Sequence, residues 1–442
     1  MLTDTIFALS SGQPPAAIAV VRISGPRARF GLETLVGRVP APRRAILARI
    51  RDPGAGGEVI DSGLVLWFPG PKSETGEDMA ELQLHGGRAV IAGVLQALGQ
   101  LDGFRPAEAG EFTRRAFLNG RIDLTVVEGL ADLIGAETEA QRRQAYRQLS
   151  GALAERAETW RQRLIEALAL VEAGIDFSDE GDVSGDLAAP ALVIASTLCN
   201  EIRQALADDR RGERLRDGFV VAIAGPPNAG KSSLLNRLAR REAAIVTPIP
   251  GTTRDVIEVH LDLAGYPVTL LDMAGIRPTD DPVEQEGVRR AEARAAAADL
   301  VLWVVDASDS ETSDSATKDP QAEGRRWVVV NKTDRLDSSS QQPEFGISAL
   351  TGAGVECLLA RLAEHIGTAF SAPEPALVTR ERHRHALEET IAGLERAQAQ
   401  GDREDILAED LRLAARALGR LTGRVDVEDV LDVIFRDFCI GK

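Results

Sequence analysis

Residues 219–236 constrain the fold more than any other stretch of the chain. An apolar run, Phe219–Ala224, precedes the pattern Gly-x-x-x-x-Gly-Lys-Ser at 225–232, and a helical pattern of leucines follows it. A strand, a glycine-rich loop and a helix in this order are the setting in which such a loop binds phosphate groups. The two glycines let backbone N–H groups face the phosphates, and the helix adds its positive N-terminal end. The flanking strand and helix argue against the alternative, a chance glycine-rich turn.

Three motifs fit the phosphate and Mg²⁺ side of a nucleotide. In the glycine-rich loop, Lys231 is expected to bridge the β- and γ-phosphates, and the Ser232 hydroxyl to ligate Mg²⁺. Downstream, Gly251-Thr-Thr-Arg-Asp255 offers hydroxyl groups, with Thr253 placed to meet Mg²⁺ and the γ-phosphate. Asp272-Met-Ala-Gly275 closes a predicted strand. Its carboxylate is suited to hold a Mg²⁺-bound water, and its last N–H to sense the γ-phosphate.

Two later motifs fit a guanine base. Asn331-Lys-Thr-Asp334 follows the apolar run Trp327–Val330, and the Asp334 carboxylate matches the two N–H donors on the edge of guanine. Adenine lacks that pair of donors and would leave the carboxylate unpaired. Ser348-Ala-Leu350 comes next, where a backbone N–H can meet guanine O6. Five motifs in this order, each at the end of a predicted strand, predict a GTP-binding GTPase domain.

The group that activates water for hydrolysis is less obvious. Many GTPases place a water-orienting Gln directly after the glycine of the third motif, but this chain has Ile276 there. Glu284, just downstream, is the candidate replacement, and a carboxylate that begins a helix is the alternative. Asn228 is a candidate ligand of a monovalent cation beside the phosphates, with a turn-forming Asn as the alternative.

The residue pattern divides the chain into domains. Residues 1–118 carry dense apolar runs bounded by turn residues, which predict an α/β domain. Residues 119–215 and 376–442 have the spacing of long amphipathic helices, which predicts a helical bundle. Residues 216–375 alternate strand and helix signals, which predicts a Ras-like P-loop domain with a mostly parallel sheet. The expected strands are 18–23, 63–68, 81–84, 219–224, 256–263, 267–272, 300–306 and 326–331.

Helical stretches lie on both sides of the predicted nucleotide domain. The simplest architecture is therefore one helical domain into which residues 216–375 have been inserted. The fold class predicted for the whole chain is a multidomain mixture of α/β and all-α parts. Within the insertion, the acidic and Ser-rich segment 307–324 predicts a surface loop, and Ser371–Pro375 predicts a linker.

Composition limits the compartment and the partners. The 442 residues include 51 Lys and Arg and 68 Asp and Glu. The resulting net charge of −17 argues against a protein that binds nucleic acid by itself through electrostatic attraction. A local basic face, or a partner that supplies the basic surface, stays open. Three cysteines cannot pair completely, which predicts a reducing, cytoplasmic compartment. Because neither a signal peptide nor a spanning apolar run is found, we expect no membrane contact.

Two features near the end of the chain each have two interpretations. Four arginines recur every four residues beside an apolar stripe, which fits either a solvated helix face or a ridge that contacts phosphates. They are Arg412, Arg416, Arg420 and Arg424. The chain ends in Phe438-Cys-Ile-Gly-Lys442, a poor prenylation signal. Cys439 is either a nucleophile or positioning group on a short tail, or a core residue packed under phenylalanines.

The chain resembles the MnmE (TrmE) family of tRNA modification GTPases. The resemblance extends over essentially all 442 residues, and its most specific marker is the terminal Phe438-Cys-Ile-Gly-Lys442 after a GTPase domain and a helical block. The other markers are Leu66-Trp-Phe-Pro-Gly-Pro71, Thr75-Gly-Glu-Asp78, His85-Gly-Gly87, Gly110-Glu-Phe-Thr113, Arg115-Ala-Phe-Leu-Asn119, Ile175-Asp-Phe177 and Gly251-Thr-Thr-Arg-Asp255.

The resemblance implies a folate site and a dimer. The N-terminal domain, 1–118, would bind a tetrahydrofolate derivative (5-formyl- or methylene-tetrahydrofolate) and would dimerise. Glu74 stands where the family usually has an aromatic residue, so a stacking contact is expected to be absent, and Ser11–Ala17 lacks the Gly-rich run common there. The positions that correspond to the family's folate contacts are Arg22, Glu81, Arg121 and Lys442.

The resemblance also implies a complete catalytic nucleotide site. Glu284 corresponds to the family's water-positioning Glu, and Cys439 to a functionally required Cys. Met273 stands where the family usually has Thr and cannot donate a hydrogen bond. Mg²⁺ would be held by Ser232 and Thr253, and K⁺ by Asn228, Thr247, Ile249 and Thr252. The implied GTP contacts are Asn228, Ala229, Gly230, Lys231, Ser232, Ser233, Thr247, Pro248, Ile249, Pro250, Gly251, Thr252, Thr253, Asp272, Met273, Ala274, Gly275, Asn331, Lys332, Asp334, Ser348, Ala349 and Leu350.

The implied partner is an FAD-dependent protein of the MnmG type, which would form a heterotetramer with the homodimer. Together they would add an aminomethyl or carboxymethylaminomethyl group to C5 of the wobble uridine (U34) of certain tRNAs. An acidic chain can leave much of the tRNA binding to such a partner. Two other functions stay open: a GTP switch protein without modification chemistry, and a folate-dependent one-carbon enzyme gated by GTP.

Overall fold

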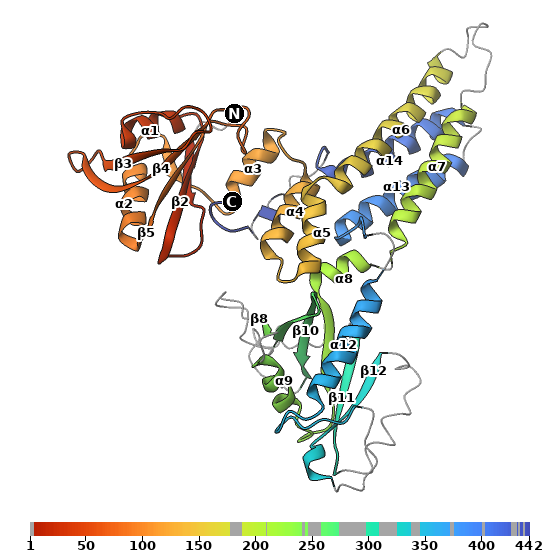
Figure 1. Cartoon of the computed structure of the whole chain (residues 1–442). Coiled ribbons are helices and arrows are strands. Elements are labelled where there is room, and N and C mark those ends of the chain that lie inside the picture. Colours follow the sequence, from red (N-terminus) through yellow and green to blue (C-terminus); the bar gives the residue numbers. More distant parts are fainter. Residues whose placement is uncertain are drawn as a thin grey trace, which may run out of the picture. The chain divides into compact units, whose positions relative to one another are not determined.

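The computed structural model forms two units, Met1–Ala131 with Leu149–Glu166 and Arg412–Lys442, and Asp132–Gln148 with Ala167–Leu411 (Figure 1). Each unit contains one six-stranded sheet. No helix among the described residues is long and apolar enough to cross a membrane. The residues that the structure describes are 4–176, 188–208, 210–240, 244–245, 258–273, 298–308, 325–336, 345–371, 375–399, 403–425, 431, 434–435 and 438–442.

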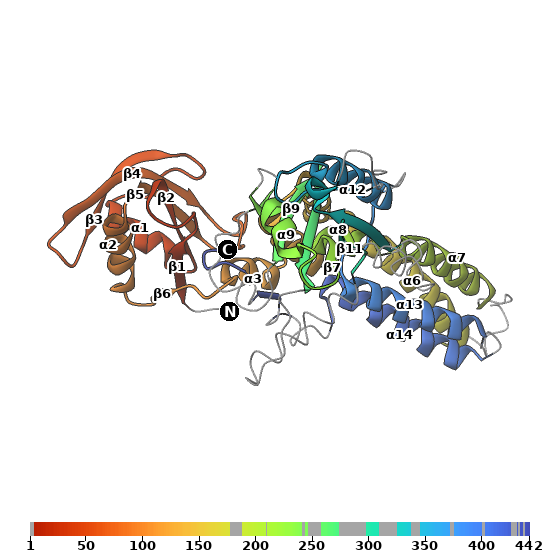
Figure 2. The ribbon, with the colours of Figure 1, turned by 90° about the horizontal axis from the view of Figure 1, so that it is seen from below.

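The first unit is an α/β domain with helical segments attached. Its strands are β1 Thr5–Leu9, β2 Ala16–Ser24, β3 Ile46–Asp52, β4 Glu58–Phe68, β5 Met79–Gly86 and β6 Phe104–Pro106, and its first helices are α1 Ala28–Val36, α2 Arg88–Gly99 and α3 Glu111–Leu118. The strand order is β3-β4-β5-β2-β1-β6, antiparallel except for the parallel pair β1 and β6. Helices α1 and α2 cover one face of the sheet, over Val21, Val65 and Leu82 (Figure 2). The three strands expected here are confirmed as β2, β4 and β5.

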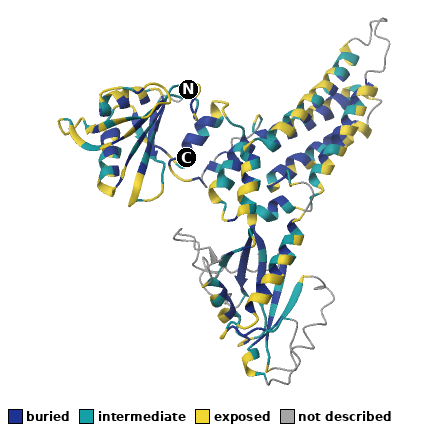
Figure 3. Ribbon diagram, in the orientation of Figure 1, coloured by how far each residue is buried: buried dark blue, intermediate teal, exposed yellow. Residues whose placement is uncertain are grey.

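Long helices follow, as predicted. They are α4 Leu124–Gly135, α5 Glu139–Leu149, α6 Ala152–Asp176, α7 Ala188–Leu206, α8 Arg211–Asp217, α13 Glu381–Ala399 and α14 Glu404–Thr422. Helices α7 and α13 pack side by side, with Arg203 paired to Glu395. Buried residues line the facing sides of these helices (Figure 3). The apolar stripe of α14 is buried as expected, at Leu411, Ala414, Leu418 and Leu421.

One arginine of the stripe predicted at 412–424 pairs with an acidic group, just after the end of α14. Arg424 pairs with Glu158 of α6 at 2.8 Å. Arg412 and Arg420 also have partners within the chain. This pairing favours the interpretation of a solvated, ion-paired helix face over that of a ridge dedicated to phosphates.

The second unit contains the predicted nucleotide domain. Its strands are β7 Phe219–Ala224, β8 Ala244–Ile245, β9 Glu258–Leu263, β10 Tyr266–Asp272, β11 Leu300–Asp306 and β12 Arg326–Asn331, with helices α9 Lys231–Ala239 and α12 Val355–Phe370 and the 3-10 turn η3 Thr333–Arg335. The order is β12-β11-β7-β10-β9-β8. The four strands from β12 to β10 are parallel, and β9 and β8 add antiparallel pairs. All five strands expected here are therefore confirmed, and the motifs follow the carboxyl ends of β7, β10 and β12.

The nucleotide domain is inserted into the helical domain. The chain enters it through α8 and returns through α12 to the segment before α13. The two connections touch, since a Cβ atom at Gly212 would lie 2.1 Å from the carbonyl oxygen of Val378. Buried Arg384 fixes this junction by donating from Nε to Glu213 Oε1 (3.0 Å) and from Nη2 to Asp208 Oδ1 (2.9 Å). Most of the loop expected at 307–324 and of the linker expected at 371–375 lies outside the described residues.

Candidate nucleotide-binding site

The glycine-rich loop between β7 and α9 has a backbone that requires its two motif glycines. Gly225 has φ +140° and Gly230 has φ +93°, values that residues with a side chain rarely adopt. A Cβ atom at Gly225 would lie 2.1 Å from Val304 O on β11. At Gly230 it would lie 2.2 Å from Asn331 Nδ2. The loop is thus packed between a neighbouring strand and the guanine motif, which fixes its path.

The phosphate and Mg²⁺ groups come together at the start of α9. Lys231 Nζ donates to the carbonyl oxygens of Gly225 and Pro226, both at 2.9 Å, so it arches back over the loop. Ser232 Oγ donates to Asp272 Oδ2 at 3.0 Å. A hydroxyl and a carboxylate are hard oxygen ligands of the kind that Mg²⁺ prefers. The two predicted Mg²⁺-side groups therefore fit that ion.

Asn331 joins three of the motifs. Its side chain is buried, with Nδ2 donating to Ala229 O at 2.8 Å and Oδ1 accepting from Ala349 N at 2.9 Å. The first bond reaches the phosphate loop, and the second reaches the Ser348–Leu350 motif. One amide thus sets the distance between the phosphate side and the base side of the site.

Lys332 adds a second link between the motifs. Its Nζ donates to Asn228 O at 2.7 Å and to Asp306 Oδ2 at 2.6 Å. The Lys332 hydrogen bond lowers the pKa of the Asp306 carboxyl below its ordinary value, against a smaller opposing effect of burial. Asn228 and Lys332 both have positive φ, at 62° and 64°. Asn228 is therefore a loop residue with an exposed side chain, which fits both interpretations given to it.

A cleft of about 1280 Å³ opens beside these residues. Asp334 is exposed at its wall, as a carboxylate that reads guanine must be. The Ser348 and Ala349 N–H groups donate within the protein, to Ala353 O and Asn331 Oδ1. Of the three N–H groups in this motif, that of Leu350 is left for a ligand. Leu350 itself is 79% exposed and lines the cleft.

Sequence reasoning missed two residues that shape this cleft. Arg237 of α9 donates from Nε to Ala349 O (2.7 Å) and from Nη2 to Leu350 O (2.5 Å), so it holds the base-side motif in place. Asp306 anchors Lys332, as described above. Neither residue belongs to a recognised motif, and Arg237 lies between leucines in a pattern typical of an ordinary amphipathic helix.

Fourteen of the predicted nucleotide-binding residues lie in the described part of the chain, in or next to the motifs that form this site, and their role in binding stays a prediction. The fourteen are Asn228, Ala229, Gly230, Lys231, Ser232, Ser233, Asp272, Met273, Asn331, Lys332, Asp334, Ser348, Ala349 and Leu350. The predicted residues outside the described part of the chain are Thr247, Pro248, Ile249, Pro250, Gly251, Thr252, Thr253, Ala274, Gly275 and Glu284. Among described residues, no cluster of three or more His, Cys, Asp or Glu could hold a metal.

The predicted folate positions meet in part on the first sheet. Arg22 of β2 donates to Glu81 Oε1 of β5, from Nη2 at 3.0 Å and from Nε at 3.2 Å. Its Nη1 lies 3.1 Å from Glu74 but makes no well-aligned hydrogen bond. The residue that replaces the family's aromatic thus supplies a charge to Arg22 in place of a stacking face. Arg121 is exposed, and its aliphatic stem packs on Gly76 in the loop that carries Glu74.

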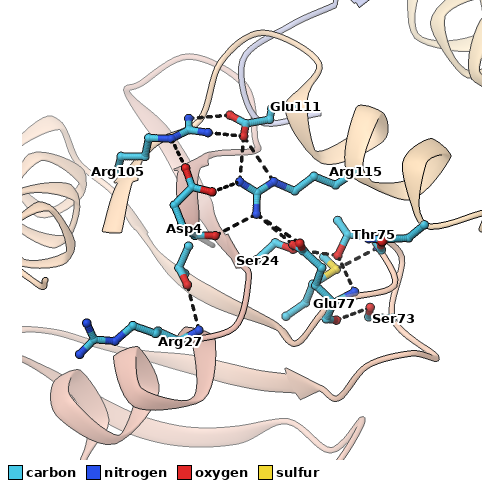
Figure 4. Close-up of polar contacts among 12 residues, drawn as sticks. Asp4, Ser24, Arg27, Ser73, Thr75, Glu77, Arg105, Glu111 and Arg115 are labelled. Carbon is cyan, nitrogen blue, oxygen red and sulfur yellow. Dashed lines mark hydrogen bonds and ion pairs between the residues drawn. The ribbon is translucent and has the colours of Figure 1, made fainter. Parts of the chain in front are cut away.

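A buried ionic cluster holds that loop against the sheet (Figure 4). The guanidinium of Arg115 is fully buried and pairs with Asp4, Glu77 and Glu111 at 3.0, 3.1 and 2.9 Å. Burial alone would raise the pKa of the Glu111 carboxyl, but hydrogen bonds from Arg105 and Arg115 hold it below its ordinary value. The cluster ties the start of the chain to α3 and to the loop around Glu77.

The C-terminal tail lies on the same domain. Ile440 forms a β-bridge with Ala109, and Gly441 O accepts from Ser10 Oγ at 2.8 Å. Cys439 is exposed, so the interpretation of a core cysteine is wrong, although Phe438 beside it is buried. Lys442 is partly buried at the end of this anchored tail. The structure therefore supports a cysteine thiol that is open to reaction partners.

Comparisons with known proteins match the chain along its whole length. The family model described as GTP-binding protein TrmE N-terminus matches residues 5–121, and that of the MnmE helical domain matches residues 124–439. The "tRNA modification GTPase MnmE" of Azorhizobium caulinodans is 59% identical over 441 residues, covering 100% of this chain and 99% of the relative. The protein of the same description from Parvibaculum lavamentivorans is 57% identical over 443 residues, covering 99% of this chain and 100% of the relative.

Proposed function

The chain belongs to the MnmE family of tRNA modification GTPases, and from that premise we propose its specific reaction. It is a GTPase that acts in tRNA modification. With an FAD-dependent partner of the MnmG type, it adds an aminomethyl or carboxymethylaminomethyl group to C5 of the wobble uridine (U34) of certain tRNAs. The observation that carries this proposal is the full-length similarity to tRNA modification GTPases, combined with the cleft that the described nucleotide-binding residues line.

In the proposed hydrolysis, each side of the cleft has its own task. Lys231 turns from its carbonyl acceptors to the β- and γ-phosphates. Ser232, with Thr253, would hold Mg²⁺, and Asp272 would hold a water bound to that ion. Asp334 accepts from guanine. Glu284 orients the attacking water in place of the missing Gln. Asn228, Thr247, Ile249 and Thr252 would hold a K⁺ ion, which would supply positive charge beside the phosphates.

A tetrahydrofolate derivative is the proposed one-carbon donor. Support comes from Arg22, which donates a hydrogen bond to Glu81. Its Nη1 is buried beside Glu74 and makes no well-aligned hydrogen bond. Such a donor suits a polar ring or carboxylate of the ligand. Arg121 and Lys442 complete the proposed contacts. When bound, the folate supplies the one-carbon unit.

Cys439 is proposed to act in the modification. Its exposure on an anchored tail supports this role, because a thiol must be reachable to react. Cys439→Ser is expected to abolish modification while GTP turnover is kept. Full modification by this variant would remove the role.

The proposed assembly is a homodimer that binds two copies of the partner. The first sheet supports dimerisation, since Leu47 and Leu64, directly paired across β3 and β4, are exposed on the face opposite α1 and α2. Light scattering is expected to give twice the chain mass, and a monomer at micromolar concentration would contradict this. A cytoplasmic location is part of the proposal because the tRNA substrates are found there.

The deciding experiment is mass analysis of tRNA nucleosides from cells that lack the chain. Loss of the C5-modified wobble uridine, restored by the wild-type chain, supports the proposed reaction. Unchanged wobble uridine would favour the GTP switch without modification chemistry. A different folate-derived product would favour a one-carbon enzyme gated by GTP.

A further inference from the structure

Helix α5 has one face that is bonded to the nucleotide domain and its connections. Three glutamines spaced three and four residues apart donate their side-chain amides to backbone carbonyl oxygens. Gln141 donates to Arg216 O at 3.0 Å, and Gln144 to Gly212 O at 2.8 Å. Gln148 donates to Leu377 O at 2.6 Å. This inner face therefore holds both α8, where the chain enters the nucleotide domain, and the segment by which it returns.

A fourth bond ties α5 to the central part of the nucleotide domain. The Ala140 N–H donates to Gly265 O, in the turn between β9 and β10, at 3.1 Å. Strand β10 ends at Asp272, which meets Ser232 in the nucleotide site. Helix α5 is thus fixed to the element that leads directly to the Mg²⁺ side of the cleft.

The outer face of α5 has a different chemistry. The side chains of Arg142 and Arg143 are 52% and 73% exposed, and both pair with the single carboxylate of Glu139. Exposed pairs of this kind contribute little net stability, so a phosphate group can compete with Glu139 for the arginines. Arg147 lies one turn further along the helix and is partly exposed.

An exposed aromatic residue stands among these arginines. Tyr146 is 57% exposed, although the chain contains only two tyrosines. The other, Tyr266, stacks on Phe370 at 5.4 Å in the nucleotide domain. Burial therefore does not explain Tyr146, whereas an aromatic ring between arginines is suited to pack on a ribose or an unstacked base.

The local charge contrasts with that of the whole chain. Helix α5 carries three arginines, all on its outer face, and one acidic residue, in a protein of net charge −17. A polyanion is therefore attracted to this region and repelled by most of the remaining surface.

From these observations we propose that the outer face of α5, formed by Arg142, Arg143, Tyr146 and Arg147, binds the sugar–phosphate backbone of the tRNA substrate. This inference rests on the proposed function, which supplies tRNA as the polyanion. Because the inner face is bonded to the nucleotide domain, the bound RNA segment moves with that domain. The interaction is electrostatic and independent of sequence, as phosphate contacts are.

The test compares a triple variant, Arg142→Ala with Arg143→Ala and Arg147→Ala, with wild type. The probe is an unmodified tRNA transcript titrated at several KCl concentrations. Each lost phosphate contact should lower the slope of log K against log salt by about 0.9. We expect the slope to fall by about two to three, and affinity at low salt to fall by tenfold or more. GTP turnover without RNA should match wild type, which shows that the triple variant is folded.

The matched control is Arg29→Ala with Arg361→Ala. These arginines are also exposed and paired to a carboxylate on their own helix. The control should bind the transcript as wild type does. Tyr146→Ala should weaken binding by fivefold or more with an unchanged salt slope.

Two results would overturn the inference while leaving the proposed function intact. One is a triple variant with the affinity and salt slope of the control. The other is a triple variant that binds the transcript with wild-type affinity but no longer binds an acidic protein, which would make that protein the partner of this face. The proposed function is judged separately, by the wobble-uridine analysis of cells that lack the chain.

Discussion

Replacing Asn331 tests whether one buried amide sets the spacing between the phosphate side and the base side of the cleft. Asn331→Ala removes two hydrogen bonds, of 2.8 and 2.9 Å, and leaves Ala229 O and Ala349 N without partners. Both of those residues are buried, so water cannot replace the amide easily. Each unsatisfied group costs about 1–3 kcal/mol. We therefore expect the free energy of unfolding of the nucleotide domain to fall by about 2–5 kcal/mol.

Asn331→Asp separates the two halves of the bridge. The carboxylate keeps an acceptor for Ala349 N but loses the donor to Ala229 O, and it introduces a charge at a site that is 1% exposed. Burial raises the pKa of such a carboxyl, and its protonated form can donate to Ala229 O again. The defect should therefore shrink as the pH falls toward 5 and grow as the pH rises.

The matched control is Asn236→Ala, because Asn236 lines the same cleft but is exposed. Urea unfolding followed by the fluorescence of the domain's tryptophans measures stability, and titration with a fluorescent GDP analogue measures affinity. Asn331→Ala should weaken GDP binding by at least tenfold, and Asn236→Ala by less than threefold. Equal effects of the two substitutions on both measurements would refute the bridging role.

Three further predictions follow. Arg115→Met leaves buried carboxylates less paired and should cost about 3–5 kcal/mol in urea unfolding. The pKa values of the Asp4 and Glu111 carboxyls are lowered in the folded state from their ordinary values of 3.8 and 4.5, so the wild-type free energy of unfolding should fall as the pH drops below these values. Arg115→Met should lose less stability over the same drop in pH, and an equal loss would contradict the role given to Arg115. Arg384→Met should lower the midpoint of unfolding while GDP affinity per folded molecule stays unchanged. GTP turnover should be faster in K⁺ than in Na⁺ at equal ionic strength, and equal rates would remove the cation role of Asn228.

The parts of the nucleotide site formed by residues adjacent in the chain could be predicted from the sequence, because neighbouring residue types alone set their backbone conformation. Gly230, Lys231 and Ser232 are adjacent in the chain, and the backbone path they need follows from their residue types. The strands before each motif are dense apolar runs, since a parallel sheet is covered on both faces. Five such runs were therefore enough to predict both the fold and the order of the site.

The links between the motifs could not be predicted in the same way. Arg237 reaches Ala349 across 112 positions, and no periodicity in α9 distinguishes it from a solvated arginine. The inner face of α5 was also missed, because three glutamines on a helix predict solvent exposure rather than bonds to backbone carbonyls. Strand β3 was overlooked since charged residues interrupt its apolar positions, as befits a strand at the sheet edge.

The C-terminal tail is anchored beside the N-terminal strands of the first sheet. In the antiparallel pair of β1 and β2, Ala8 lies opposite Arg22 and Leu9 lies opposite Val21. Leu9 is therefore a neighbour of the position that carries Arg22. Gly441 packs on Leu9, where a Cβ atom would lie 2.2 Å from Leu9 O, and its φ of +98° also favours glycine. Lys442 follows directly. The tail is therefore held by the strand that positions Arg22, which gives a physical reason for a Gly before the final Lys and for an exposed Cys439 near the proposed folate contacts.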